Sequence, residues 1–363
     1  MGAQPVNSVV VMAGGTGGHV FPALAVARYL AGQGVRIHWL GTRAGIEAEL
    51  VPNNGFAITY LDVSGVRGQG LKRLLLAPFK LVVAVVQAMQ LMRSVKADCV
   101  IGLGGYVTGP GGVAAKLLGK KLVIHEQNAI AGFTNKTLAG FADKVLQAFP
   151  KAFAPSPKVE WVGNPVRVEI ADLPAPEQRY AEHEGKIRVL VMGGSQGAVA
   201  LNELVPEAFA KLPAELRPEI RHQAGKKNLD KADAKYRALG LEADVIPFIN
   251  DMPAAYAWAD LVVCRSGALT VSEIAAAGVA SVLIPFPFAV DDHQTANGKF
   301  LSDAGAAVLF QQKDLTAEKL ADSLKELMQR ERLLGMAKIA RTLAKPESTA
   351  LVAAECLRGT NHG

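Results

Sequence analysis

The sequence predicts an α/β protein with two similar domains, each built on a parallel sheet, that face a shared cleft. Its 363 residues exceed the usual size of one hydrophobic core, and 50% of them are hydrophobic, so two cores can be filled. An apolar run leading into a glycine-rich loop occurs twice, at 9–18 and at 189–197. The glycine pairs of the two loops lie 179 residues apart, about half the chain, which indicates one loop in each domain.

Apolar runs of strand length alternate with helix-compatible stretches along the chain. This alternation is typical of βαβ units, in which successive strands are parallel and helices cover the sheet. We expect strands at 9–12, 35–40, 98–103, 121–125, 144–148, 159–162, 187–192, 218–223, 243–246, 260–264 and 280–285, and helices at 22–32, 112–118, 198–211, 231–239, 253–257 and 270–277.

The chain also shows where its domains divide. Residues 163–186 contain glycine, prolines and a charged run, which is typical of a linker. The stretch 316–357 is rich in Ala, Leu, Lys and Glu and predicts helix with a break near Pro346. By analogy with other two-domain folds of this kind, the last helix is expected to cross back to the first domain. The expected parts are an N-terminal domain at 1–163, a C-terminal domain at 164–340 and the C-terminal helix region 341–363.

Composition narrows the class of protein. Cys99, Cys264 and Cys356 are widely spaced and predict neither a disulfide framework nor a zinc site, and the N-terminus has no secretion signal. We therefore expect a protein of the reducing cytosol. Residues 1–163 hold 16 Lys and Arg against 7 Asp and Glu, whereas the remainder holds 23 against 26. The basic half favours a polyanionic partner, either nucleic acid or an anionic membrane surface, unless the charges are scattered at random over the surface.

The segment 71–92 is strongly apolar but carries the cations Lys72, Arg73 and Lys80. A membrane span needs about 20 uninterrupted apolar residues, and here Pro78 and Lys80 interrupt the run. Two interpretations remain. The segment is a helix buried against the sheet, or it is an interfacial helix whose apolar face enters lipid while its cations meet anionic headgroups. One end can be buried and the other exposed, so the two are compatible.

The first glycine-rich loop is Gly14-Gly15-Thr16-Gly17-Gly18, followed by His19. Its glycines do not follow the G-x-G-x-x-G spacing, no acidic residue ends the next strand, and the chain has no G-x-x-x-x-G-K-[ST] motif, which disfavours nicotinamide chemistry and P-loop phosphoryl transfer. The loop lets an anion or a substrate approach the backbone. The helix dipole disfavours an imidazolium at His19, so this histidine can serve as a neutral base, or it can merely cap the helix or bond a carbonyl.

Polar or glycine-rich segments follow several other strands, at the edge where open α/β sheets bind ligands. The glycines within 102–112 predict either tight turns with close helix packing or, at the strand ends, a binding site for a diphosphate. His125 to Asn128 ends an apolar strand. Thr270 with Glu273 matches a capping box, while Glu273 could instead accept two ribose hydroxyls. The polar cluster from Asp291 to Asn297 is by itself a loop, but it would form a sugar-binding wall if it lay opposite His19 across a cleft.

Six motifs together resemble the MurG family, the UDP-N-acetylglucosamine:undecaprenyl-diphospho-muramoylpentapeptide N-acetylglucosaminyltransferases. They occur in order and span nearly the whole chain. The resemblance implies two Rossmann-like domains of the glycosyltransferase-B type, with the lipid acceptor on the first domain and the nucleotide sugar mainly on the second. The motifs are GGTGGH at 14–19, GLGGYVTGPGG at 102–112, HEQN at 125–128, GNPVR at 163–167, GGSQGA at 193–198 and CRSGALTVSE at 264–273.

The resemblance also implies roles for single residues. The family often shows Gln-Gln where this chain has His293-Gln294, which leaves the role of His293 open. The implied substrate-binding residues are Thr16, Gly17 and Gly18 near the donor, Asn128 and Gln294 on the sugar, Arg167 and Ser195 on the diphosphate, Ile249 on uracil through its backbone, and Ala268, Leu269, Thr270, Val271, Ser272 and Glu273 on phosphate and ribose.

The implied reaction is an inverting transfer from UDP-N-acetylglucosamine to the 4-hydroxyl of the lipid-linked muramoyl-pentapeptide, with His19 as the base. Arg167, backbone N–H groups and a helix dipole would meet the charge on the leaving diphosphate, without a metal or another cofactor. The implied partners are the donor, the undecaprenyl-diphosphate-linked acceptor and the anionic inner-membrane surface, with no nucleic acid. We expect peripheral attachment to the cytoplasmic face of the bacterial inner membrane. The alternatives are a UDP-N-acetylglucosamine 2-epimerase and a non-enzymatic nucleotide-binding membrane module.

Overall fold

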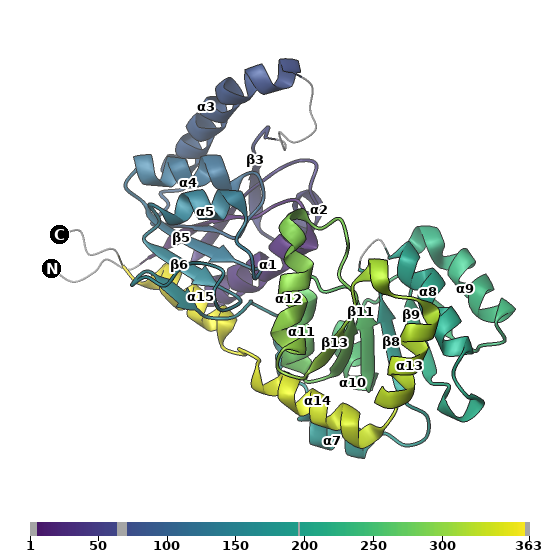
Figure 1. The fold of residues 1–363 in the computed structure, drawn as a ribbon. Coiled ribbons are helices and arrows are strands. Elements are labelled where there is room, and N and C mark those ends of the chain that lie inside the picture. Colours follow the sequence, from purple (N-terminus) through teal and green to yellow (C-terminus); the bar gives the residue numbers. More distant parts are fainter. Residues whose placement is uncertain (1–5, 64–70, 195–196, 360–363) are drawn as a thin grey trace. The chain divides into compact units, whose positions relative to one another are not determined.

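The computed structural model describes residues 6–63, 71–194 and 197–359 (Figure 1). The chain divides into two compact units. The first unit comprises Met1–Val166 together with Lys345–Gly363, and the second comprises Arg167–Ala344.

The first unit is built on a seven-stranded parallel sheet with the order β3-β2-β1-β4-β5-β6-β7. The order reverses direction between β1 and β4, as in the Rossmann fold, and ligands bind such sheets at the carboxyl ends of the two strands that flank the reversal. The strands are β1 (Ser8–Met12), β2 (Arg36–Gly41), β3 (Ala57–Tyr60), β4 (Cys99–Gly102), β5 (Lys121–Glu126), β6 (Lys144–Gln147) and β7 (Val159–Trp161).

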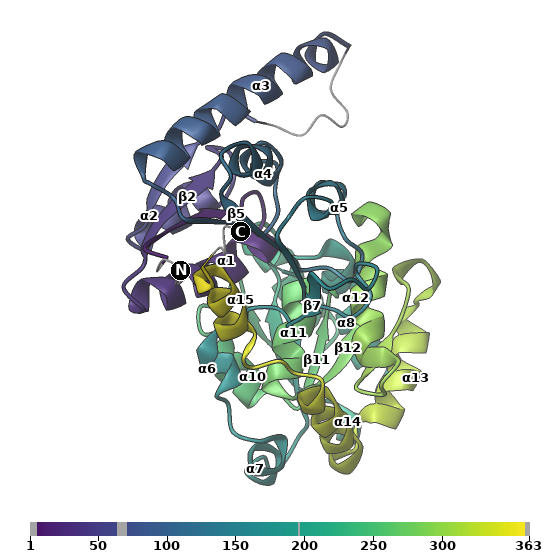
Figure 2. The same ribbon diagram turned by 90° about the vertical axis from the view of Figure 1, so that its left-hand side faces the viewer.

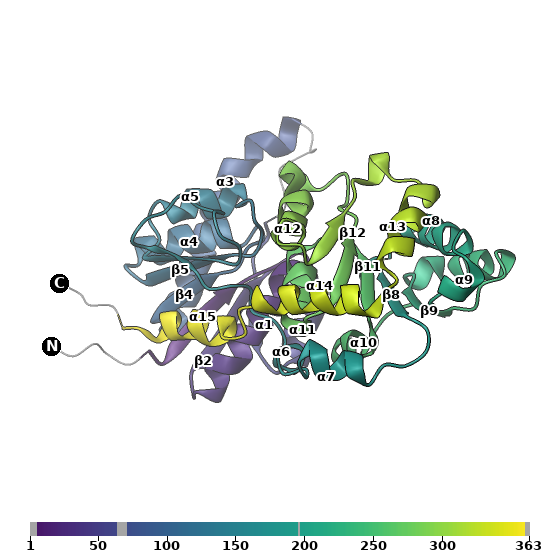
Figure 3. The same ribbon diagram turned by 60° about the horizontal axis from the view of Figure 1, so that its bottom comes forward.

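Alternate side chains of these strands enter two different cores, because successive residues of a strand point to opposite faces. Val9 and Val11 pack with α1 (Gly17–Gly32) and α15 (Ser348–Leu357). Val10 and Met12 pack with the helices of the opposite face. The views in Figures 2 and 3 show α15 beside α1, and Lys121 anchors α15 through Nζ donors to Glu355 Oε1 at 3.0 Å and to the Arg358 carbonyl at 2.8 Å. The helices of the opposite face are α3 (Leu71–Ser94), α4 (Thr108–Leu117) and α5 (Phe133–Ala139), and α2 (Glu47–Asn53) lies between β2 and β3.

Helix α3 is buried against the sheet in one part and exposed in another, so the two interpretations of its sequence are compatible. Ala84, Ala88 and Met92 are buried against the sheet, whereas Phe79 is 70% exposed and Val82 61% exposed. Figures 1 and 2 show the N-terminal end of α3 extending away from the sheet. The side chains of Lys72 and Arg73 lie outside the described residues. Within the described ranges, no helix is long and apolar enough to cross a membrane.

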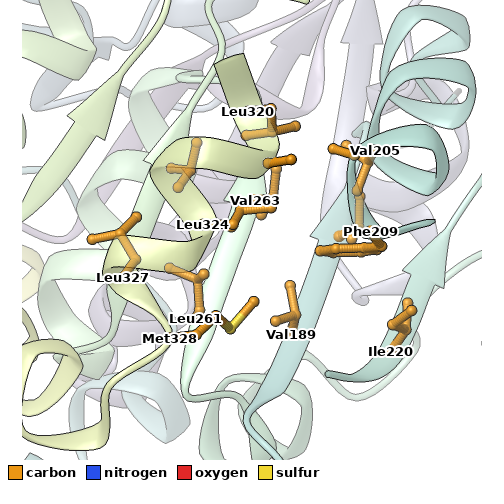
Figure 4. Packing of buried hydrophobic residues seen from close by; sticks show 14 of the residues in the cluster. Val189, Val205, Phe209, Ile220, Leu261, Val263, Leu320, Leu324, Leu327 and Met328 are labelled. Atoms are coloured by element: carbon orange, nitrogen blue, oxygen red, sulfur yellow. The ribbon is translucent and has the colours of Figure 1, made fainter. Parts of the chain in front are cut away.

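The second unit repeats the same topology. Its six-stranded parallel sheet has the order β10-β9-β8-β11-β12-β13, so the direction reverses between β8 and β11. Apolar side chains of α8, α13 and α14 form a core on one face of this sheet. Figure 4 shows part of this core, where Val205 and Phe209 of α8 and Leu320 and Leu324 of α13 lie over the strands. The elements are β8 (Arg188–Met192), β9 (Glu219–Gln223), β10 (Asp244–Ile246), β11 (Leu261–Cys264), β12 (Ala280–Leu283), β13 (Ala307–Leu309), α6 (Val168–Ala171), α7 (Pro176–Ala181), α8 (Val199–Ala210), α9 (Leu229–Ala238), α10 (Met252–Trp258), α11 (Ala268–Ala277), α12 (His293–Ser302), α13 (Ala317–Leu327) and α14 (Arg330–Thr342).

The predicted strands are confirmed to within two residues, but three expectations about other segments are wrong. Much of the expected linker is folded into the second unit, because buried Arg179 in α7 donates to the carbonyls of Tyr256 and Ala277. The polar cluster at 291–297 is not only a loop, since α12 begins at His293. The third concerns the capping box at Thr270 and is described with the site below.

Candidate functional site

The first glycine-rich loop lies at the carboxyl end of β1, where the strand order reverses. It leads into α1, whose N-cap residue is Thr16 in an extended conformation. The first N–H groups of a helix have no partner within the helix, so the amides of Gly17 and Gly18 can face an anion. Gly17, Gly18 and His19 are half-buried, and Thr16 is exposed. The loop can therefore bind a negatively charged group from solvent.

A buried carboxylate that the sequence analysis missed holds this loop in place. Glu47 is fully buried and accepts hydrogen bonds from the Gly15 amide at 2.9 Å, the Thr42 amide at 2.9 Å and the Thr42 hydroxyl at 2.7 Å. A Cβ on Gly14 would lie 2.5 Å from Glu47 Oε1, so a larger residue there would displace this carboxylate. Glu47 thus ties the loops after β1 and β2 together.

The glycines after β4 make room for the first loop. A Cβ on Gly105 would lie 2.5 Å from the carbonyl oxygen of Gly14, and a Cβ on Gly104 would lie 2.6 Å from His19 Nδ1. Gly104 also has a φ of +107°, which disfavours other residues. These contacts support close packing as the role of the two glycines. The loop after β4 forms one wall beside His19.

The segment after β5 forms the other contact of His19. Gln127 Oε1 lies 2.9 Å from His19 Nδ1, so the imidazole bonds a side-chain amide, and Thr16 rather than His19 occupies the N-cap position. Gln127 is 1% exposed and His125 is fully buried. Burial lowers the pKa of His125 to about 4, so its ring is neutral near pH 7.

Glu126 and Asn128 shape the turn that follows β5. The buried Glu126 carboxylate accepts from the Asn128 amide at 2.9 Å, the Gly132 amide at 3.1 Å and Asn135 Nδ2 at 2.8 Å. Asn128 Nδ2 also donates to Glu126 Oε1 at 3.2 Å. Glu126 therefore organises the turn, and it holds the half-buried Asn128 next to Gln127 in the chain.

In the second unit, a glycine-rich loop follows β8 at the equivalent reversal of strand order. Gln223 Nε2 donates to the Gly194 carbonyl at 2.8 Å and fixes the start of this loop. Ser195 lies outside the described residues.

The helix α11 begins beside this reversal, at the carboxyl end of β11. Its N-cap is Gly267, in an extended conformation and without a side-chain cap. The predicted capping box at Thr270 and Glu273 is therefore wrong, because the helix begins before Thr270. Ala268 and Val271 are buried, and Leu269, Thr270 and Ser272 are half-buried in the first turns.

Glu273 has two partners in place of a backbone cap. Arg167 donates to Glu273 Oε1 from Nη2 at 2.7 Å and from Nε at 3.2 Å, and the hydroxyl of Tyr256 donates to Oε2 at 3.2 Å. Burial raises the pKa of Glu273, while the guanidinium and the hydroxyl oppose this rise. The side chain of Arg167 is 37% exposed and that of Glu273 only 5%. A buried carboxylate thus holds an accessible guanidinium.

The other predicted donor residues of the second unit lie in two further loops. Ile249 is 8% exposed and lies shortly before α10, whose N-cap Asp251 accepts from the Ala254 amide at 2.9 Å. Gln294, in the first turn of α12, accepts from the Phe286 amide at 2.9 Å. Its side chain therefore holds the loop after β12.

Two groups of predicted residues are thus brought together. In the first unit, loop 14–19 meets the HEQN segment through His19 and Gln127. In the second unit, Arg167 meets Glu273, with Tyr256 as a partner that the sequence did not indicate. Among the residues that the structure describes, no three or more His, Cys, Asp or Glu side chains are grouped to hold a metal ion.

Comparison with known proteins accounts for both units. Residues 9–147 match the N-terminal domain of glycosyltransferase family 28, and residues 188–352 match the C-terminal domain of that family. The chain is 52% identical over 359 residues to the UDP-N-acetylglucosamine–N-acetylmuramyl-(pentapeptide) pyrophosphoryl-undecaprenol N-acetylglucosamine transferase of Marinobacter nauticus, covering 99% of both chains. It is 56% identical over 350 residues to the protein of the same name from Cupriavidus metallidurans, covering 96% of this chain and 97% of the relative.

Solved structures agree with these matches. The crystal structure of Acinetobacter baumannii MurG superimposes with a TM-score of 0.85 at 45% identity, covering 96% of this chain and 99% of that one. The rice protein Os79 in complex with UDP shares only the fold, with a TM-score of 0.67 at 16% identity, covering 96% and 99%. The two units are Rossmann-like domains of the glycosyltransferase-B fold, as predicted. With near full-length similarity in both sequence and structure, this chain belongs to the MurG family of glycosyltransferases.

Proposed function

We infer that this chain transfers N-acetylglucosamine from UDP-N-acetylglucosamine to the 4-hydroxyl of undecaprenyl-pyrophosphoryl muramyl-pentapeptide, the step from lipid I to lipid II in bacterial peptidoglycan synthesis. This inference rests mainly on the identity of 52% and 56%, over nearly the whole chain, to two transferases of that name. The geometry is consistent with it, because each sheet places a glycine-rich loop and a helix N-terminus at its reversal of strand order.

The first unit supplies the base. The imidazole of His19 is half-buried, and Gln127 engages its Nδ1. Its Nε2 then takes the proton of the acceptor hydroxyl while the oxygen attacks the anomeric carbon and the bond from that carbon to UDP breaks. This single displacement inverts the configuration at the anomeric carbon. Thr16, Gly17 and Gly18 present the helix N-terminus to the donor beside this reaction, and Asn128 binds the sugar.

The second unit binds the rest of the donor. Arg167 and Ser195 bind the diphosphate, the N-terminus of α11 (Ala268 to Ser272) holds phosphate and ribose, the backbone of Ile249 binds uracil, and Gln294 binds sugar hydroxyls. Arg167 is accessible, so it can turn from Glu273 towards the diphosphate. This movement frees Glu273 Oε1 for the ribose hydroxyls while Tyr256 continues to hold Oε2. The guanidinium meets the charge that develops on the leaving UDP.

The first unit also docks to the membrane that carries the acceptor. Exposed apolar side chains lie on the three helices that cover one face of its sheet: Phe79 on α3, Leu117 on α4 and Phe133 on α5. Lys80 is exposed next to Phe79, and a cation near anionic headgroups contributes about 1 kcal/mol. This arrangement fits peripheral attachment to the anionic cytoplasmic face of the inner membrane.

Transfer of labelled N-acetylglucosamine in detergent tests the function. We expect a lipid-linked disaccharide and an equal amount of UDP, formed only when the lipid-linked muramyl-pentapeptide is present, and undiminished by EDTA. Turnover of the donor without the acceptor would favour a 2-epimerase. Binding of the donor with no turnover would favour a nucleotide-binding module, and inhibition by EDTA would contradict a metal-independent reaction.

Replacing His19 with alanine tests the base. We expect His19→Ala to lower kcat by about 10²-fold or more, because the hydroxyl loses its proton acceptor, while KM for the donor changes by less than about threefold. The matched control is His38→Ala, a histidine of the same unit whose Nε2 bonds the Thr59 hydroxyl at 2.9 Å. Near-normal turnover of His19→Ala would mean that another group is the base.

Vesicle sedimentation tests the membrane surface. Phe79→Ser should weaken binding to phosphatidylglycerol vesicles about tenfold, because a buried phenylalanine contributes about 1.5–3 kcal/mol. Lys80→Glu should weaken it further, and only on anionic vesicles. The matched control is Phe288→Ser, which removes an 82% exposed phenylalanine from the second unit. Equal effects of Phe79→Ser and Phe288→Ser, or none from either, would remove α3 from the docking surface.

A further inference from the structure

A line of hydrogen bonds in the first unit ends at His19. Gln127 Oε1 lies 2.9 Å from His19 Nδ1, and Gln127 Nε2 lies 3.0 Å from His125 Nδ1. His125 Nε2 lies 2.9 Å from the carbonyl oxygen of Gly163. His125 and Gln127 are buried, whereas His19 is half-buried. This line connects the backbone after β7 to His19. Of the three side chains, only that of His19 is partly accessible to solvent.

The hydrogen positions along this line follow from the carbonyl at its end. The Gly163 oxygen can only accept, so His125 Nε2 carries the hydrogen. His125 is neutral because burial lowers its pKa to about 4, so its Nδ1 bears a lone pair. The NH₂ group of Gln127 must then face His125, and the Gln127 oxygen must face His19.

A second contact fixes the same orientation of the Gln127 amide. Gln127 Nε2 also lies 3.2 Å from the backbone oxygen of His125, which can only accept. Turning the amide over would place two oxygens against each other there, and the amide oxygen against the Nδ1 lone pair of His125. The amide therefore has one stable orientation, and His19 Nδ1 must carry a hydrogen to donate to it.

We propose that Gln127, held by His125, is a positioning residue that keeps His19 in the tautomer with its hydrogen on Nδ1. The lone pair of a neutral His19 is then on Nε2, the nitrogen that faces away from Gln127. This proposal rests on the proposed role of His19 as the base. It assigns the HEQN segment a function beyond binding the sugar, because two of its side chains determine which nitrogen of the base can accept a proton.

The partner of His19 is an uncharged amide, although Glu126 lies in the same segment and Glu47 contacts the loop that leads to His19. Glu126 is occupied by Asn128, Gly132 and Asn135, and Glu47 by the loop amides. A carboxylate on Nδ1 would orient the ring and also stabilise the imidazolium, as in a Ser-His-Asp triad. Gln127 orients the ring without adding a negative charge. The direction of the proton acceptor is thus fixed by hydrogen-bond geometry alone.

Nitrogen NMR of the full-length protein labelled at its seven histidines tests the proposal directly. The His19 signals are assigned by their loss in His19→Gln. In the wild-type protein at a pH where His19 is neutral, we expect Nδ1 to be the protonated nitrogen and Nε2 the unprotonated one. If the neutral His19 of the wild-type protein carries its hydrogen on Nε2, the proposal is overturned, irrespective of the results with the variants.

Two variants connect the tautomer with turnover. Gln127→Met keeps the size of the side chain but cannot accept from His19, so the hydrogen should move to Nε2 and kcat should fall at least about tenfold, with KM for the donor within about threefold. The protonated carboxyl group of Gln127→Glu can still accept from His19 and donate to His125, so this variant should retain the Nδ1 tautomer. The matched control is Gln147→Met, a buried glutamine of the same sheet that instead accepts from the Phe153 amide at 3.0 Å.

The outcomes separate this proposal from the function on which it rests. An unchanged His19 tautomer in a folded Gln127→Met would overturn the role of Gln127, even if kcat fell. If Gln127→Met does not fold, the wild-type spectrum and Gln127→Glu decide the question. Normal turnover by His19→Ala would instead refute the base and leave the tautomer result intact.

Discussion

The contact on which the candidate catalytic group depends is the packing of two glycine-rich loops at the reversal of strand order in the first sheet. Gly105 lies against the backbone of Gly14, and Gly104 lies against His19, at distances that leave no room for a Cβ. Loops at this edge of an open α/β sheet form the crevice in which ligands bind. The loop after β4 therefore packs directly against His19, whose Nδ1 also bonds Gln127 in the segment after β5.

Buried polar groups, rather than apolar packing, hold these loops in position. Glu47 fixes loop 14–19, Glu126 fixes the turn after β5, and Gln223 fixes the corresponding loop of the second unit. Each group is buried and accepts from or donates to backbone atoms, and an unsatisfied backbone group there would cost about 1–3 kcal/mol. The second unit uses the same principle to hold a cation, because Glu273 orients the accessible guanidinium of Arg167. The two units thus share a topology and the use of buried polar side chains that bond the backbone of the loops after the strands.

Most of the fold could be predicted because the central strands are mainly apolar runs, several of which end in glycine-rich or polar segments. The edge strands β3 and β13 could not, since each is short and partly exposed and lacks that signal. Helices α1, α4 and α11 begin earlier than their apolar residues indicated, because their first turns contain small residues or glycine. Among the candidate site residues, His19 could be proposed from the local glycine-rich motif that precedes it. Glu47 and Gln127 act on partners 32 and 108 residues away, so no local pattern reveals their roles.

The central claim, that close approach of the loop after β4 places His19 for catalysis, is tested most directly by the kcat of Gly104→Ala. A matched control is Gly34→Ala, because Gly34 has a similar positive φ of +82° but open space where the Cβ would be. We expect Gly104→Ala to lower kcat at least about tenfold at saturating donor, through displacement of the imidazole, while Gly34→Ala retains wild-type turnover. Equal turnover of the two variants would contradict the account.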